Sequence, residues 1–383
     1  MNMDFLPVNI FLRCLKGIIM CHRLSIRKGE GSMTNRENFF AAMSHQEPER
    51  IPFSLKLCEE LEQEFEQKYH TKDYLSYYEC PIVPVKINPT KRLQDFSPYF
   101  QGMGYDYYNE WGVGFRIGSS GYHFRQFVSP MQSFETPKQV WEFPLPDILE
   151  DYRWEGVKER IEQLKKEDKI TMNTSGCHID IFEPAWYLRG MENLLADMLT
   201  DEEMAEAYLE RMCQIKCQIA KRCAEVGFDV IVFGDDVATQ RGMMMSKELW
   251  RKWLKPRLFR AIQSAREVNP KTLCYYHSDG DVRDIIEDLI EIGVDILNPV
   301  QPECMDPITV KGQYGSRVSF WGTIGTQTTM PFGTPEEVRN KTLEMKEKVG
   351  KGGGLVLAPT HLLEPEVPWE NIEAFVRACK ERS

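Results

Sequence analysis

The sequence lacks the long apolar segment of a membrane protein and the paired cysteines of a small secreted one. No run of about 18 uncharged apolar residues occurs in the chain, so we expect no transmembrane helix and no membrane contact. Its 11 cysteines form no Cys-x-x-Cys pair. Scattered thiols of this kind are typical of the reducing cytoplasm, which is where we expect the protein to be.

The chain also has fewer basic than acidic residues, with 47 Lys and Arg against 58 Asp and Glu and a net charge of −11. Nucleic acids are bound mainly by neutralising phosphates with basic side chains, so nucleic acid is not an expected partner. No Gly-x-Gly-x-x-Gly follows a predicted strand, which argues against a dinucleotide-binding fold. What is present, 42% hydrophobic and 27% charged residues, is ordinary for a globular protein.

Short apolar runs alternate with helical patterns from about residue 170 onward. Continuous apolar runs are typical of strands that are buried on both faces of a parallel sheet. Repeated strand–helix units of this kind, with residues 51–57 as a first strand, predict an α/β fold of the (β/α)8 TIM barrel type. The six later strands are predicted at 170–175, 229–233, 272–276, 294–299, 318–322 and 354–358.

Two segments depart from this alternation. Residues 1–32 begin with the charge of Asp4 and are interrupted by Arg13 and Lys16, which does not match a signal peptide. We expect them to be an N-terminal extension outside the fold, with a single barrel domain at 33–383. Residues 75–145 are rich in Tyr, Trp, Gly and Pro, and we interpret them as the second strand followed by an insertion over the barrel mouth.

The candidate active-site residues are those that follow the predicted strands, because the C-terminal strand ends carry the active site in this fold. Acids, amides or imidazoles follow all six later strands. This density of titratable groups favours an enzyme over a non-catalytic binding barrel. The candidates are Cys177, His178, Asp180, Glu183, Asp235, Asp236, His277, Asp279, Asp281, Asn298, Gln301, Glu303, Thr323, Gln327, His361 and Glu364.

Two histidines are the sharpest candidates. His277 and His361 each follow an apolar strand, and the His277-Ser-Asp279-Gly turn lets the imidazole and the carboxylate converge. Both groups are zinc ligands, and three protein ligands leave an open catalytic position. The alternative is that the histidines act by hydrogen bonding or acid–base catalysis without a metal.

The adjacent acids Asp235 and Asp236 follow the predicted strand at 229–233. One interpretation is that they bind substrate or serve as a general base with a raised pKa. The alternative is that one accepts hydrogen bonds from a loop backbone while the other pairs with Arg241.

Several motifs, taken in order, resemble uroporphyrinogen decarboxylase-like proteins. The resemblance covers about residues 33–380 and implies the barrel fold. It is carried by MTNRENFFAA at 33–42, PERIP at 48–52, WYLRGMEN at 186–193, DVIVFGDD at 229–236, GVDILNPVQP at 293–302, FGTPEE at 332–337 and LAPTH at 357–361.

That superfamily implies two chemistries, decarboxylation of uroporphyrinogen without a cofactor and methyl transfer involving corrinoid proteins, often with zinc. The decarboxylases carry an Arg-Gln-Ala-Gly-Arg-Tyr stretch whose arginines bind substrate carboxylates, whereas residues 51–58 here read IPFSLKLC. The zinc methyltransferases show His-x-Cys-Gly after one strand and a Cys after the last. His277-Ser-Asp279-Gly and His361 stand in those places, and this harder ligand set favours oxygen over sulfur.

We therefore predict a methyltransferase of the O-demethylase type, which moves a methyl group from an oxygen-linked donor, such as a methoxylated aromatic, to a corrinoid protein. The catalytic residues would be His277, His361 and Asp235, and zinc would be held by His277, Asp279 and His361. The alternatives are a decarboxylase of uroporphyrinogen or of a smaller acid, a metal-dependent hydrolase and a non-catalytic barrel. The small-molecule donor would bind to Asp236, Asn298, Gln301, Trp111, His178 and Glu183.

Overall fold

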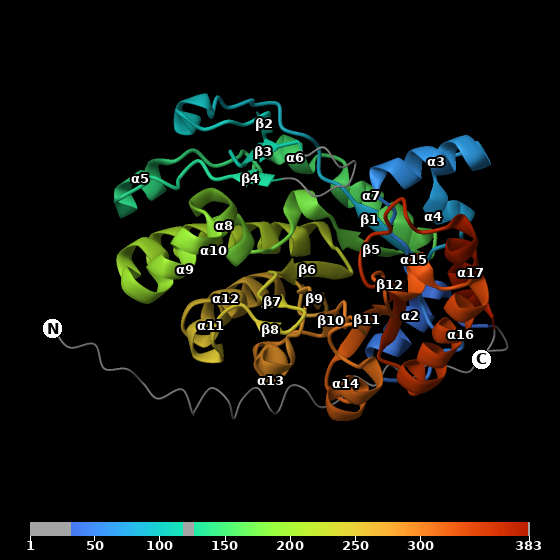
Figure 1. Ribbon diagram of the computed structural model, residues 1–383. Helices are drawn as coiled ribbons and strands as arrows, with labels where there is room; N and C mark the ends of the chain where they lie inside the picture. Colours follow the sequence, from blue (N-terminus) through green and yellow to red (C-terminus); the bar gives the residue numbers. More distant parts are fainter. Residues whose placement is uncertain (1–31, 118–125, 382–383) are drawn as a thin grey trace. The chain divides into compact units, whose positions relative to one another are not determined.

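The computed structural model describes residues 32–117 and 126–381, shown as ribbons in Figure 1. The predicted N-terminal extension at 1–32 lies outside these ranges, apart from its last residue. Within them, no helix combines the length and the apolar character that crossing a membrane requires.

Seven parallel strands form the central sheet, in the order β1-β5-β6-β9-β10-β11-β12. The six strands predicted after residue 169 are all present, with ends within two residues of those expected. Their parallel pairing confirms the predicted α/β architecture. The strands are β1 Ile82–Val85, β5 Ile170–Asn173, β6 Val230–Gly234, β9 Leu273–His277, β10 Ile296–Asn298, β11 Ser319–Ile324 and β12 Leu355–Pro359.

The predicted first strand at 51–57 is an extended segment beside β12, which we call the edge segment. Parallel bridges join Phe53 to Leu357 and Leu57 to Leu363, and the Ser54 amide donates to the Leu357 carbonyl at 2.9 Å. The edge segment thus adds an eighth parallel member at the end of the sheet opposite β1. Eight parallel members are what a TIM-type barrel requires, and the curled sheet has that architecture.

The barrel interior is a packed core and not a channel. Every second residue of a strand points into this interior and joins one buried cluster, which includes Val232 on β6, Tyr275 on β9 and Trp321 on β11. The Tyr275 and Trp321 rings meet edge to face with centroids 5.2 Å apart. Helix α2, Asn35–Met43, contributes Phe39 from the end where the strands begin, with its ring 6.2 Å from Trp321. Side chains that emerge beyond this layer therefore face the opposite end, the barrel mouth.

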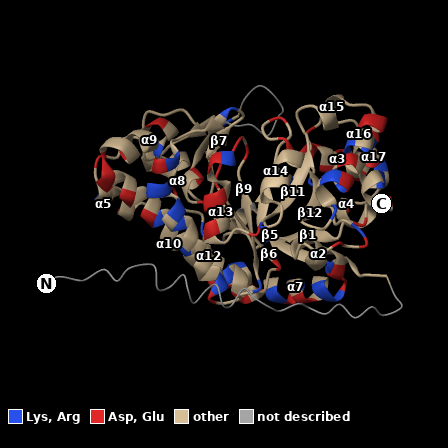
Figure 2. Cartoon of the chain, turned by 90° about the horizontal axis from the view of Figure 1, so that it is seen from below, with Lys and Arg blue, Asp and Glu red and all other residues tan. Residues whose placement is uncertain are grey.

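Helices surround the sheet, and charged residues gather on them while the central strands carry few, as Figure 2 shows from below. This distribution is expected for strands that are buried on both faces. The helices are α3 Glu59–Tyr69, α4 Tyr74–Tyr77, α5 Pro137–Glu142, α6 Asp151–Trp154, α7 Val157–Lys166, α8 Phe182–Arg189, α9 Met191–Thr200, α10 Glu202–Val226, α11 Lys247–Trp253, α12 Lys255–Arg266, α13 Ile286–Ile292, α14 Pro307–Tyr314, α15 Thr329–Phe332, α16 Pro335–Met345 and α17 Trp369–Lys380.

The chain between β1 and β5 forms the predicted insertion. It contains an antiparallel sheet of β2, Tyr107–Tyr108, β3, Gly114–Arg116, and β4, Gln126–Val128. This sheet packs on α8, where the Phe127 ring stacks on Tyr187 with centroids 4.3 Å apart. A short hairpin of β7, Ala238–Thr239, and β8, Gly242–Met243, follows β6.

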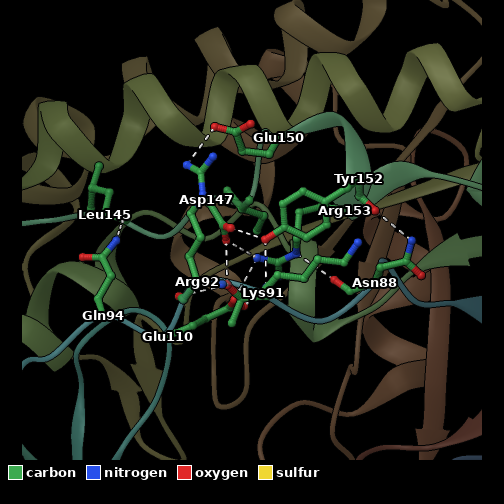
Figure 3. A network of polar contacts seen from close by, with 12 residues as sticks. Asn88, Lys91, Arg92, Gln94, Glu110, Leu145, Asp147, Glu150, Tyr152 and Arg153 are labelled. Atoms are coloured by element: carbon green, nitrogen blue, oxygen red, sulfur yellow. Dashed lines mark hydrogen bonds and ion pairs between the residues drawn. The ribbon is translucent and has the colours of Figure 1, made fainter.

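A buried polar network ties the two ends of the insertion together (Figure 3). The Arg153 side chain is 2% exposed, and its guanidinium donates to Asp147 at 2.8 Å, Glu110 at 3.1 Å and the Asn88 carbonyl at 2.7 Å. Asn88 lies where the chain leaves the barrel, and Asp147 and Arg153 lie where it returns. The network therefore fixes the base of the insertion, and Glu110 extends it to the loop that carries Trp111.

Replacing Arg153 by methionine is expected to lower the free energy of unfolding by about 3 kcal/mol, because the change leaves buried carboxylates without a counter-charge. Arg92→Met is the matched control: its partner is Glu150, the two side chains are 62% and 47% exposed, and the expected loss is below about 1 kcal/mol. Urea unfolding followed by tryptophan fluorescence measures both. Equal losses would contradict the role assigned to Arg153.

Candidate functional site

His277 stands at the centre of the candidate site, as the last residue of β9. The strand alternation that turns Tyr275 into the barrel turns His277 inward as well, at the mouth. Asn298 donates from Nδ2 to the Trp321 carbonyl at 2.7 Å, which leaves its Oδ1 to accept from His277 Nδ1 at 2.6 Å. The proton on Nδ1 is thereby fixed, and Nε2 is the nitrogen that is presented to the mouth.

Two carboxylates face that nitrogen. Nε2 of His277 lies 3.7 Å from Asp236 Oδ1 and 4.0 Å from Asp279 Oδ1, and the Asp279 amide donates to Asp236 Oδ1 at 2.8 Å. One ligand atom from each of the three side chains lies within 4.8 Å of the other two. Asp279 Oδ1 is buried and has no hydrogen-bond partner among the described residues. An orphaned carboxylate oxygen beside an imidazole nitrogen fits a bound cation.

This cluster differs in one member from the predicted metal set of His277, Asp279 and His361. The third member is Asp236, which the sequence analysis assigned to substrate binding. β6 and β9 are neighbours in the sheet, so the residues that follow them lie close together. The two adjacent acids after β6 were visible in the sequence, but the order of the strands in the sheet was not, and Asp236 could not be assigned to the cluster without it. His361 is half-buried two residues beyond β12, and its part in the site stays a prediction.

Asp235, which was predicted to be catalytic, contacts the backbone of the loop after β5 in the structure. Its side chain is buried, and Oδ1 accepts from the backbone amides of Ile181 at 2.9 Å and Glu183 at 2.8 Å. Asp235 therefore holds the loop that follows β5, which is one half of the alternative interpretation; Asp236 faces His277. Asp235 is a positioning residue, because its carboxylate is used by the protein backbone.

Asn298 and Gln301, which were predicted to bind substrate, hold other parts of the site in the structure. Both are 5% exposed, and Gln301 Oε1 accepts from the Gly280 amide at 2.7 Å. Gly280 has a φ of +89°, and a Cβ there would lie 2.6 Å from the Thr239 carbonyl. Gln301 thus fixes the turn that presents Asp279, as Asn298 fixes the ring of His277.

The loop after β5 carries His178 and is joined to the insertion by Lys216 of α10. The ammonium of this buried lysine donates to the His178 carbonyl at 2.9 Å and to Asp180 at 2.6 Å. It also lies 4.6 Å from the centroid of the Trp111 ring, so Trp111 is held against this loop. Burial and the charges of Lys56 and His277 hold the pKa of His178 well below its usual range. Sequence reasoning missed both lysines, because lysine is usually a solvated surface residue.

Burial and repulsion among the acids together set the protonation of the site. Burial together with Asp236 and Asp180 raises the pKa of Glu183 to about 7, and Glu183 accepts a hydrogen bond from the Tyr187 hydroxyl. Burial raises the pKa of Asp279 to about 6, with His277 opposing and Asp236 adding to the shift. Burial lowers the pKa of His277, but Asp279 and Asp236 outweigh it and the net shift is upward. The site therefore has an excess of acidic groups, whose negative charge a cation or an imidazolium would offset.

Comparison with known proteins identifies a matching family and several similar proteins. The chain matches the family model described as uroporphyrinogen decarboxylase (URO-D) over residues 34–382. It is similar to a methylated-thiol–coenzyme M methyltransferase of Methanosarcina mazei, with 28% identity over 208 residues, 52% of this chain and 51% of that protein. A methylcobamide:CoM methyltransferase of Methanosarcina barkeri is 29% identical over 180 residues, 47% of this chain and 49% of that protein. The chain spans about half the length of these curated relatives.

Among solved structures, a methyltransferase from Methanosarcina mazei superposes with a TM-score of 0.64 at 19% identity. The match covers 91% of this chain and 98% of that one. At this level of identity the likeness shows the fold.

Two neighbouring acids test the assignment of positioning and site residues. Asp235→Ala is expected to lower the free energy of unfolding by about 2–3 kcal/mol, because two buried amides lose their acceptor. Asp236→Ala in chelator-treated protein should cost less, because the lost hydrogen bond from the part-buried Asp279 amide is offset by removal of a carboxylate that repels Asp279 and Glu183. Urea unfolding at neutral pH measures both, and a larger loss for Asp236→Ala would reverse the two assignments.

Proposed function

The chain belongs to the uroporphyrinogen decarboxylase (URO-D) family, and from that premise we propose that it moves a methyl group from an oxygen-linked donor, such as a methoxylated aromatic, to a corrinoid protein. The observation that carries the proposal is the Asp236–His277–Asp279 cluster at the barrel mouth, with its orphaned buried oxygen. The methylcobamide:CoM methyltransferase among the relatives supports methyl transfer. The nitrogen and oxygen donors of the cluster support an oxygen leaving group over a sulfur one.

Methyl transfer from an ether needs charge stabilisation at the leaving oxygen. The bond between the methyl carbon and this oxygen breaks, its electron pair stays on the oxygen, and the methyl group passes to the nucleophilic cobalt of the corrinoid. His277, protonated through its two acidic neighbours, would donate the Nε2 proton to the oxygen as that charge develops. Asn298 keeps Nε2 aimed at the mouth, because it holds Nδ1.

The same three side chains fit a zinc ion, since Asp236, His277 and Asp279 offer one nitrogen and two carboxylate oxygens. A bound zinc would supply Lewis-acid stabilisation of the leaving oxygen. The residues around the cluster have the same tasks with or without it. Gln301 holds the Asp279 turn. Trp111, whose ring contacts Lys216, would help to exclude water from the site.

His277→Gln and Asp279→Asn are each expected to lower the rate of methyl transfer at least about 100-fold, the usual effect of removing one group that stabilises a developing oxyanion. Donor binding should weaken far less, because this interaction grows mainly in the transition state. The assay combines a reduced corrinoid protein with methoxylated aromatics and follows the methylation of cobalt by its visible spectrum. Asp284→Asn, an exposed acid in the turn before α13, is the control and should leave the rate unchanged.

The zinc content of the same variants separates the two ways of stabilising the oxygen. Loss of bound zinc together with activity in Asp279→Asn supports the metal, whereas full activity of metal-free wild type supports proton donation by His277. Wild-type rates in both variants would show that the cluster is not the active site.

Decarboxylation of uroporphyrinogen is the rival activity within this family. A substrate with eight carboxylates needs several cations, and residues 51–58 supply only Lys56. We expect anaerobic incubation with uroporphyrinogen, followed by oxidation and chromatography, to give no coproporphyrin above an enzyme-free control. Coproporphyrin at an enzymatic rate would make the chain a decarboxylase.

A further inference from the structure

Lys56 lies at the barrel mouth, on the edge segment. Phe53 and Leu55 belong to the buried cluster outside the barrel interior, so strand alternation turns Ser54 and Lys56 inward. The inward position of Ser54 is seen directly, because its hydroxyl accepts from Trp321 Nε1 at 2.8 Å and Trp321 belongs to the interior cluster. Lys56 is the next inward residue toward the C-terminal end, and its carbonyl accepts from the Leu363 amide at 2.9 Å.

Lys56 and His277 emerge from the same interior layer. Trp321 contacts Ser54 on one side and the Tyr275 ring on the other. Two residues beyond Ser54 the chain reaches Lys56, and two residues beyond Tyr275 it reaches His277. Both side chains therefore stand one step above this layer, at the level where a substrate binds.

The two side chains stand on opposite walls. From the edge segment the order runs through β12, β11 and β10 to β9, so His277 is four places away in a row of eight. Four places in an eight-membered barrel is half the circumference. Asp236 and Asp279 stand with His277, whereas Lys56 stands on the far wall. On β1, Ile82 belongs to the interior cluster and Val85 does not. Strand alternation therefore turns Lys86, four residues after Ile82, toward the mouth as well.

The ammonium of Lys56 has no carboxylate partner among the described residues. Desolvation alone lowers the pKa of Lys56, with no ion pair to oppose it, and the Lys56 charge helps to depress the pKa of His178, after burial. The residue is nevertheless exposed to solvent. An unpaired cation in such a place favours binding of an anionic group.

Because acids line the His277 wall and a cation stands on the opposite wall, we infer that Lys56 binds the carboxylate of the methyl donor. The donor is then a methoxylated aromatic acid. The inference rests on the proposed function and deepens it by naming the substrate class. The methoxy group would face His277 and the carboxylate would face Lys56, so a flat aromatic ring would span the mouth between the two walls. A neutral aryl ether of the same size would lack the second contact.

Calorimetric binding of 4-methoxybenzoate and of methoxybenzene, without any corrinoid protein, tests the inference. Wild type should bind the acid at least about 10-fold more tightly than the neutral ether, as one charge-assisted hydrogen bond allows. Lys56→Met should remove this preference, and Lys56→Arg should restore most of it. Lys138→Met on α5, with 80% of its side chain exposed, is the matched control and should bind as wild type does.

The outcomes separate this inference from the proposed function. Equal binding of acid and ether by wild type, or undiminished binding of the acid by Lys56→Met, overturns the role of Lys56. Selective binding of the acid with no methyl transfer from any ether leaves Lys56 in place and overturns the proposed reaction. A thermal unfolding midpoint of Lys56→Met at or above that of wild type shows that lost binding is not lost folding.

Discussion

The packed layer inside the barrel is the constraint on which the rest of the site depends. Tyr275 and Trp321 fill the interior, so a side chain one step further along a strand has no room below it and must face the mouth. Strand alternation then decides which residues do so. It places His277 on one wall and Lys56 on the other, without any contact between the two.

Electrostatic repulsion on one wall is the second determinant. Burial raises the pKa of Glu183 to about 7 and that of Asp279 to about 6, and the charge of Asp236 adds to both shifts. Such a group of acids is costly unless a positive charge joins it. The imidazolium of His277 and a bound zinc ion are two ways to supply that charge. The same residues can therefore serve proton donation or metal binding.

The supporting residues fix the geometry of this wall. Asn298, Gln301 and Asp235 use their polar atoms on the ring of His277 and on backbone amides. Each fixes one element of the site and leaves no polar atom of its own unsatisfied in the core. The Arg153 network does the same for the insertion, whose Trp111 contacts Lys216 of α10. Rigid support of this kind keeps catalytic groups in place before the substrate arrives.

The sequence by itself determined the strands, the barrel fold and the family, because apolar runs, strand-end acids and ordered motifs are local features. It also named His277 and Asp279, which are two of the three members of the cluster at the mouth. Only the tertiary structure decided that Asp236 joins them and that Asp235, its neighbour, does not. Strand order is long-range information, and so is the choice of which carboxylate serves a backbone amide. The role of Lys56 follows from the same fact, since its inward position depends on packing across the barrel and not on its neighbours in the chain.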